Sequence, residues 1–181
     1  MDNIVSWNIR GLNWPNKQEE VRSFLGTNKV GLIGLLETKV KMNKVNQITG
    51  AIFPGWQWQH NFELDVKGRI WIAWKPGTYN VQILQMTDQL IHYYVTQLST
   101  QKKLCVTYVY GRNQEHLRQP LWDDVQALAI HINEAWCILG DFNSILQKED
   151  RIGGIEVQDH EVHHLASFID TCEVQELRWI G

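Results

Sequence analysis

Five strand-like segments follow one another between residues 56 and 111 without a helical pattern among them, and this run limits the possible folds more than any other feature. Each segment alternates apolar and polar residues or is rich in β-branched and aromatic side chains, as strands typically are. Adjacent antiparallel strands are expected among these segments. The segments are WQWQH, GRIWIAWK, YNVQILQM, LIHYYVTQL and KKLCVTYVYG.

Helical and strand-like segments alternate on both sides of this run. Amphipathic periodicity predicts helices, and short apolar runs predict strands. The predicted helices cover residues 17–28, 43–52, 120–133 and 158–172, and the predicted strands cover residues 3–9, 29–38 and 136–142. Strands that outnumber helices, with helices before, between and after them, indicate an α/β sandwich of two sheets with helices on the outside.

The composition narrows the class of protein. A chain of 181 residues with 44% hydrophobic content is long and apolar enough for one domain with a real core. Its three cysteines lack a CxxC pair and two lie in strand-like runs, which predicts reduced thiols in an intracellular protein. No signal peptide or membrane-spanning run is visible. The net charge of −3 argues against tight electrostatic binding of nucleic acid, although a bound metal ion could offset the phosphate charge locally.

The predicted strand at residues 136–139 stops abruptly. It is wholly apolar, so we expect it to be buried on both faces, and Gly140 ends it. Asp141 and Asn143 come next, and residues two apart on an extended chain point to the same side. Open α/β sheets usually hold their ligands at this end of their strands.

Two earlier strands also end in polar side chains, Asn8 and Glu37. A carboxylate at the end of a buried strand is costly to desolvate unless it is paired or binds a cation. Carboxylates and amides are hard-oxygen ligands suited to Mg²⁺, which takes few protein ligands. Tyr110 and Asn113, in YVYGRN, are able to donate to a phosphate oxygen. A single Asn or Asp after a strand is most often a turn or cap residue, so the residues alone leave both interpretations open.

The strings SWNIRGL, LLETK, GRIWIAW, VTYVYGRN and GDFNSILQKEDRIGG occur in this order from about residue 3 to the end. They resemble the endonuclease/exonuclease/phosphatase family, in the version found in plant LINE-type non-LTR retrotransposons. GDFN and EDRIGG are specific when found together. The resemblance implies a four-layer α/β sandwich, with two packed, mainly antiparallel sheets flanked by helices. It also implies phosphodiester cleavage that depends on Mg²⁺, or on Mn²⁺ in its place.

The resemblance also implies roles for the residues at the strand ends. Asn8 and Glu37 would lie at the metal, with Glu37 as the principal ligand, and Tyr110 and Asn113 would contact the scissile phosphate. The family has a proline where this chain has Arg112, a change that removes rigidity from the loop but offers a charge to phosphate.

The water-binding end of the site follows from the GDFN string. By resemblance, Asp141 would position or deprotonate the attacking water, and Asn143 would orient it and stabilise the developing charge. The family continues to a second aspartate and a terminal Ser-Asp-His, whereas this sequence ends at ELRWIG. We therefore expect residues 1–181 to form a single domain that is incomplete at its C-terminus, and the loss of the histidine would weaken transition-state stabilisation.

Three functions remain open at this point. The first is a Mg²⁺-dependent DNA endonuclease of retrotransposon origin, expected to be an intracellular monomer without membrane contact, with a nuclear location implied by the family. The second is a non-catalytic remnant of the same fold, and the third is a phosphatase or phosphodiesterase acting on a small phosphorylated substrate. Whether the chain is an enzyme is not decided by its residues.

Charged and histidine side chains give weaker signals. Basic residues gather in sequence near the proposed site, and a DNA backbone would be their natural partner if the fold brings them to one rim. They are Lys39, Lys41, Lys44, Lys67, Arg69, Arg112, Arg118 and Arg151. His160, His163 and His164 have a spacing that could hold Zn²⁺, but a solvated helix face is the favoured interpretation.

Overall fold

The computed structural model describes residues 2–147 and 159–177. It divides into two compact units, Met1–Tyr110 with Glu134–Asp141, and Gly111–Asn133 with Phe142–Gly181. Every strand and helix predicted from the sequence is present in the described residues. The prediction of a single domain over residues 1–181 stays a prediction.

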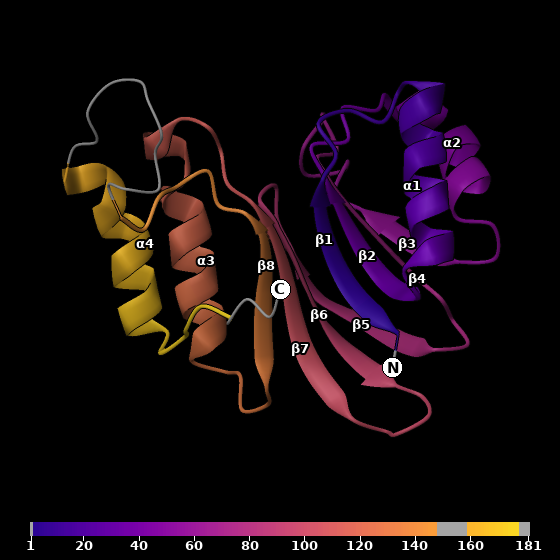
Figure 1. Ribbon diagram of the computed structural model, residues 1–181. Coiled ribbons are helices and arrows are strands. Elements are labelled where there is room, and N and C mark those ends of the chain that lie inside the picture. The colour runs from indigo at the N-terminus through magenta and orange to yellow at the C-terminus, as the bar shows by residue number, and fades with distance from the viewer. Residues whose placement is uncertain (1, 148–158, 178–181) are drawn as a thin grey trace. The chain divides into compact units, whose positions relative to one another are not determined.

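The first sheet of the first unit has the strand order β1-β2-β4-β3 (Figure 1). Its strands are β1 (Asn3–Asn8), β2 (Val30–Leu36), β3 (Gln57–His60) and β4 (Ile70–Trp74). β1 and β2 are parallel, because a helix connects them, and the other pairs are antiparallel. β2 is buried along its whole length, as expected for a wholly apolar strand.

Two helices cover one face of this sheet (Figure 1). They are α1 (Pro15–Thr27) and α2 (Val45–Ile52), the latter preceded by the 3₁₀ turn η1 (Met42–Lys44). Val21 and Leu25 of α1 and Ile48 of α2 pack with Ile33 and Trp71 of the sheet. α1 begins at Pro15, whose fixed φ suits the first turn of a helix.

The second sheet has the order β5-β6-β7-β8. Its strands are β5 (Tyr79–Met86), β6 (Leu90–Gln97), β7 (Lys103–Tyr110) and β8 (Trp136–Asp141). The first three form an antiparallel meander, and β8 is parallel to β7. The antiparallel pairing expected for this part of the chain is confirmed for β3–β4, β5–β6 and β6–β7, whereas the consecutive strands β4 and β5 lie in different sheets and do not pair.

The two sheets pack face to face within the first unit. Leu32 and Ile72 of the first sheet meet Tyr93 and Tyr108 of the second in one buried cluster. The Tyr108 hydroxyl donates a 2.6 Å hydrogen bond to the carbonyl of Val5, so a buried phenol has a partner on the opposite sheet. The α/β sandwich predicted from the sequence is confirmed.

Gly34 of β2 lies where the ring of Tyr108 crosses to the first sheet. A Cβ at this position would be 2.6 Å from two atoms of that fully buried ring. We expect Gly34→Ala to lower the free energy of unfolding by about 1–3 kcal/mol, because the ring must move off its packed position. The melting temperature would then fall by about 2–4 °C for each kcal/mol.

Gly50 in α2 is the matched control. An added Cβ there meets nothing within 4 Å, so Gly50→Ala should stabilise the helix by about 0.5–1 kcal/mol. Equal melting temperatures for the two variants would contradict the close contact between Gly34 and Tyr108.

The second unit contains two helices, α3 (Gln119–Ala129) and α4 (Asp159–Thr171), with the 3₁₀ turn η2 (Glu115–Leu117). Trp122 of α3 and Phe168 of α4 form an aromatic cluster with Phe142, with ring centroids 5.8–6.0 Å apart. α3 ends four residues before the predicted end at residue 133. The chain instead makes a tight turn in which the amide of His131 bonds the carbonyl of Leu128, and Ile130 is 79% exposed.

The prediction that β8 is buried on both faces is wrong. The apolar side chains at residues 136–139 are only partly buried. Among the described residues β8 is the edge of its sheet, so its side chains have strand neighbours on one side only. An apolar run alone does not indicate that a strand lies at the edge of a sheet, because it reflects the composition of the strand and not which other elements pack against it.

Cys105, Cys137 and Cys172 form no disulfide, and burial raises the pKa of each thiol. No helix within residues 2–147 and 159–177 has the length and apolar character needed to cross a bilayer.

Candidate functional site

Asn8 and Asp141 meet at one end of the sandwich. The Asn8 Nδ2 atom donates a 2.6 Å hydrogen bond to Asp141 Oδ2, joining the last residue of β1 to the last residue of β8. The Asn8 carboxamide oxygen accepts a 3.3 Å hydrogen bond from the Arg10 amide. Two strand ends from different sheets therefore present a carboxylate and an amide at one place.

Tyr110 is the direct neighbour of Asp141. The two residues are register partners in the parallel pair β7–β8, so their side chains leave the sheet on the same face. Tyr110 is only 3% exposed and belongs to the cluster between the sheets. Three of the residues predicted from strand ends thus lie together.

Glu37 follows β2 directly, and Leu36 is the register partner of Asn8. Its φ of 55° is left-handed, which is uncommon for a residue with a side chain and is found mostly where surrounding contacts hold it. The Glu37 amide donates a 2.7 Å hydrogen bond to the carbonyl of Arg69. The carboxylate is 21% exposed and forms a 2.7 Å ion pair with Lys39.

Arg69 is one of the basic residues near the site in sequence, and no sequence pattern indicates its contact with the site. Its guanidinium carbon lies 5.2 Å from the centre of the Tyr110 ring, a cation–π arrangement. Its Nε atom lies 3.2 Å from Asp65 Oδ2, and the two side chains are 15% and 4% exposed. Arg69 therefore bonds the Glu37 backbone through its carbonyl and covers Tyr110 with its side chain.

This ion pair should contribute to stability. Replacing Arg69 with Met leaves the Asp65 carboxylate buried without its cation, a change that costs about 3–5 kcal/mol for a fully buried pair. Because Arg69 is partly exposed, we expect the free energy of unfolding to fall by about 2 kcal/mol in denaturant melts. The double variant Asp65→Asn, Arg69→Met should lose less than Arg69→Met alone. A larger loss in the double variant would show that the pair is not the cause.

The remaining predicted residues belong to the second unit. Asn143, with a left-handed φ of 47°, donates a 2.7 Å hydrogen bond from Nδ2 to the carbonyl of Gly111. Arg118 donates from Nη1 to the carbonyls of Arg112 and Asn113, at 2.9 and 3.1 Å. Asn143 and Arg118 therefore hold the backbone of the same loop. Arg118 is 6% exposed, so it supports this loop and is not part of a basic surface.

Two sequence signals fall partly outside the described residues. The EDRIGG string with Arg151 lies in residues 148–158, and the side chain of His160 also lies outside the described part. On α4, His164 Nε2 lies 3.5 Å from Glu115 Oε1, and His163 is exposed. Within residues 2–147 and 159–177, no group of three or more His, Cys, Asp or Glu residues could hold a metal ion.

The donor set still fits Mg²⁺. Mg²⁺ is usually bound by one or two carboxylates and keeps several waters for substrate phosphates to replace. Glu37, Asp141 and Asn8 offer two carboxylates and an amide at neighbouring strand ends. All are hard oxygen donors, which suit Mg²⁺ or Mn²⁺ better than Zn²⁺.

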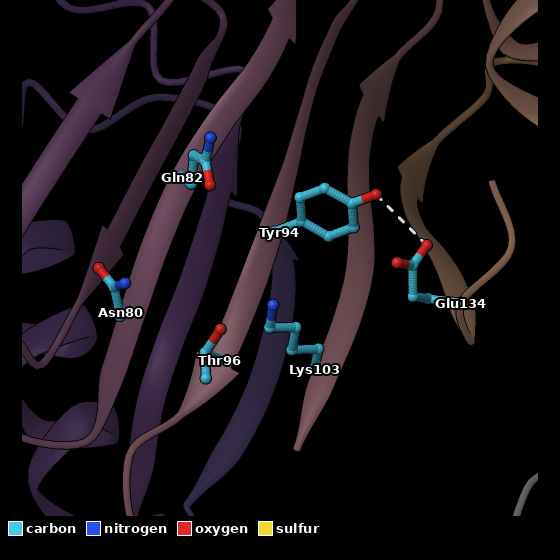
Figure 2. A pocket seen from close by; sticks show the side chains of 6 residues that line it. All are labelled: Asn80, Gln82, Tyr94, Thr96, Lys103 and Glu134. Carbon is cyan, nitrogen blue, oxygen red and sulfur yellow. Dashed lines mark hydrogen bonds between the residues drawn. The ribbon is translucent and has the colours of Figure 1, made fainter. Parts of the chain in front are cut away.

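A separate cavity of about 160 Å³ lies on the second sheet (Figure 2). The Tyr94 hydroxyl donates a 3.3 Å hydrogen bond to Glu134 at its edge. Lys103 begins β7 and Tyr110 ends it, so this cavity is at the opposite end of the strand from the candidate site. Its lining residues are Asn80, Gln82, Tyr94, Thr96, Lys103 and Glu134.

A family model described as the endonuclease/exonuclease/phosphatase family matches residues 5–161 of the chain. No curated protein matches the sequence. Several solved structures have the same fold at low sequence identity.

The endonuclease domain of TRAS1, a telomere-specific non-LTR retrotransposon, has a TM-score of 0.69 at 12% identity, over 93% of this chain and 71% of that one. The AP endonuclease LMAP from Leishmania major has a TM-score of 0.71 at 13% identity, over 93% of this chain and 66% of that one. TDP2 from D. rerio, in complex with a single-strand DNA product, has a TM-score of 0.60 at 18% identity, over 90% of this chain and 64% of that one. The chain thus spans about two thirds of the length of these proteins.

Proposed function

Since the chain belongs to the endonuclease/exonuclease/phosphatase family, whose members are hydrolases, we propose that it cleaves phosphodiester bonds in DNA with the help of Mg²⁺ and derives from a retrotransposon endonuclease. The observation that carries this proposal is the 2.6 Å hydrogen bond between Asn8 and Asp141, beside Tyr110. It brings a carboxylate, an amide and a phenol together at one end of the sandwich.

The metal would be held by Glu37, with Asn8 beside it. When bound, it supplies a Lewis acid that polarises a phosphoryl oxygen. The 2.7 Å hydrogen bond from the Glu37 amide to the Arg69 carbonyl and the left-handed φ fix the direction in which the Glu37 side chain leaves the backbone. The backbone of this ligand therefore does not have to be ordered when the ion binds.

Asp141 would accept the proton of the attacking water. The hydrogen bond from Asn8 to Oδ2 fixes the rotation of the carboxylate and so the direction of its other oxygen. Tyr110 would donate a hydrogen bond from its hydroxyl group to a phosphate oxygen. The Arg69 guanidinium over the Tyr110 ring adds positive charge, which favours negative charge on that phosphate. The roles of Arg112, Asn113 and Asn143 at the phosphate and the water stay predictions.

The loops around Glu37 support DNA as the substrate. Asn13 donates to the Lys39 carbonyl at 2.6 Å and Thr38 to the Gly68 carbonyl at 3.0 Å, so three loops of the first unit are joined. They carry the exposed cations Lys39, Lys41 and Lys67, suited to phosphates along a backbone. Trp14, in the first of them, is 71% exposed and suited to stacking on a base. A small phosphorylated substrate would use neither feature.

A comparison of substrates tests the proposal. Purified protein with Mg²⁺ would be incubated with supercoiled plasmid and, separately, with a small aryl phosphomonoester, each with an EDTA control. We expect nicking of the plasmid that EDTA abolishes, with no release from the monoester. Hydrolysis of the monoester alone would favour a phosphatase, and no turnover of either substrate by a cooperatively folded protein would favour a non-catalytic remnant.

A further inference from the structure

The segment Glu37-Thr38-Lys39 has an unusual backbone. Glu37 and Lys39 both have left-handed φ angles, 55° and 53°, although neither is glycine. Lys39 Nζ lies 2.7 Å from Glu37 Oε1, and the two side chains are 58% and 21% exposed. An ammonium group therefore sits directly on the carboxylate that is the predicted principal metal ligand.

Four hydrogen bonds hold this backbone in place. The amides of Glu37 and Leu12 bond the carbonyls of Arg69 and Thr38, at 2.7 and 2.8 Å. Thr38, which is fully buried, donates its hydroxyl to the Gly68 carbonyl, and the Asn13 side chain donates to the Lys39 carbonyl. Backbone outliers persist when the surroundings over-determine them, and such residues cluster at functional sites.

An ordinary surface ion pair does not explain this construction. Exposed pairs contribute little to stability and are broken readily by salt or by a competing ion. Two left-handed residues are a backbone strain that the weak attraction of such a pair would not offset. The strained backbone is explained if the function of the site requires the Lys39 ammonium group to be close to the Glu37 carboxylate.

We propose that Lys39 is a built-in counter-cation that competes with the divalent ion for Glu37 and is displaced when the ion binds. The inference rests on the proposed function. A compact ammonium group on a flexible stem can leave a carboxylate at little cost, whereas the backbone that carries it stays fixed. Metal binding would thereby release the Lys39 ammonium group, which could then contact a DNA phosphate beside the site.

The competition has a measurable size. When two binding events are coupled, each typically changes the affinity of the other by about 5–150-fold. Because Lys39 is more than half exposed, water screens it, and we expect an effect at the low end. Lys39→Met should therefore bind Mg²⁺ about fivefold more tightly than the wild type.

Calorimetric titration of Mg²⁺ into the full chain tests this without reference to turnover. The variants are Lys39→Met, Lys39→Arg, which keeps the charge, and Lys41→Met, a matched exposed lysine two residues away. We expect tighter binding only in Lys39→Met, with Lys39→Arg and Lys41→Met within about twofold of the wild type. All three should melt within about 2 °C of the wild type, since an exposed pair contributes little.

The outcomes separate this inference from the proposed function. Wild-type nicking with an unchanged or weaker Mg²⁺ affinity in Lys39→Met would overturn the role of Lys39 alone. Equal tightening in Lys39→Met and Lys41→Met would show a general charge effect and would also overturn it. The absence of saturable Mg²⁺ binding in both the wild type and Lys39→Met would overturn the inference and the proposed metal site together.

Discussion

Asp141→Asn is expected to lower Mg²⁺-dependent plasmid nicking by about three to four orders of magnitude, the upper part of the range for removing a general base. The asparagine has the same shape, and its amide oxygen can still accept the hydrogen bond that Asn8 donates to Asp141. The position of the side chain is therefore kept while its ability to take a proton is lost. The rate of conversion of supercoiled to open-circular plasmid measures the effect.

A second aspartate serves as the control for this change. Asp170 is exposed on α4, so Asp170→Asn removes the same charge without touching the strand ends. We expect it to nick at the wild-type rate. If Asp141→Asn kept more than a tenth of the wild-type rate while melting normally, Asp141 could not be the base.

Glu37→Gln is expected to weaken Mg²⁺ binding by at least about 100-fold, which corresponds to about 2.8 kcal/mol. The carboxylate is the group that offers negative charge to the ion, and a carboxamide of the same shape offers only a dipole. Asp141→Asn should weaken Mg²⁺ binding by less than about tenfold, because its main role is toward the water. Calorimetric titration of each variant with Mg²⁺ separates the two carboxylates.

Glu19→Gln is the control for the titration, because Glu19 is exposed on α1 and pairs only with Arg22 among the described ion pairs. Its affinity for Mg²⁺ should equal that of the wild type. Unchanged affinity in both Glu37→Gln and Asp141→Asn would show that the metal site is assigned to the wrong residues.

The strand and helix positions could be predicted because each depends on local periodicity. β5, β6 and β7 alternate or are rich in β-branched residues, and all three form where expected. The end of α3 was predicted too late, because Ile132 continues the apolar pattern of Leu121, Val125 and Leu128, whereas the helix ends at Ala129. Sequence periodicity reports which residues could be buried, whereas tertiary packing decides which are.

Some residues of the candidate site could also be selected from local sequence patterns, and others could not. Asn8, Glu37 and Asp141 could be selected because each ends an apolar strand. The contact of Arg69 with Tyr110 could not, because it joins the loop residue before β4 to the last residue of β7, which no local pattern connects. The left-handed backbone of Lys39 was equally hidden, since the usual signals for that conformation are glycine and asparagine.

The most direct test of the account is the nicking of supercoiled plasmid by the wild-type chain over a range of Mg²⁺ concentrations, beside Glu37→Gln. We expect nicking by the wild type that rises to saturation with Mg²⁺ and disappears in EDTA, and we expect Glu37→Gln to need a far higher Mg²⁺ concentration. Nicking that persists in EDTA, or an identical Mg²⁺ dependence in both proteins, would contradict a divalent ion held by Glu37.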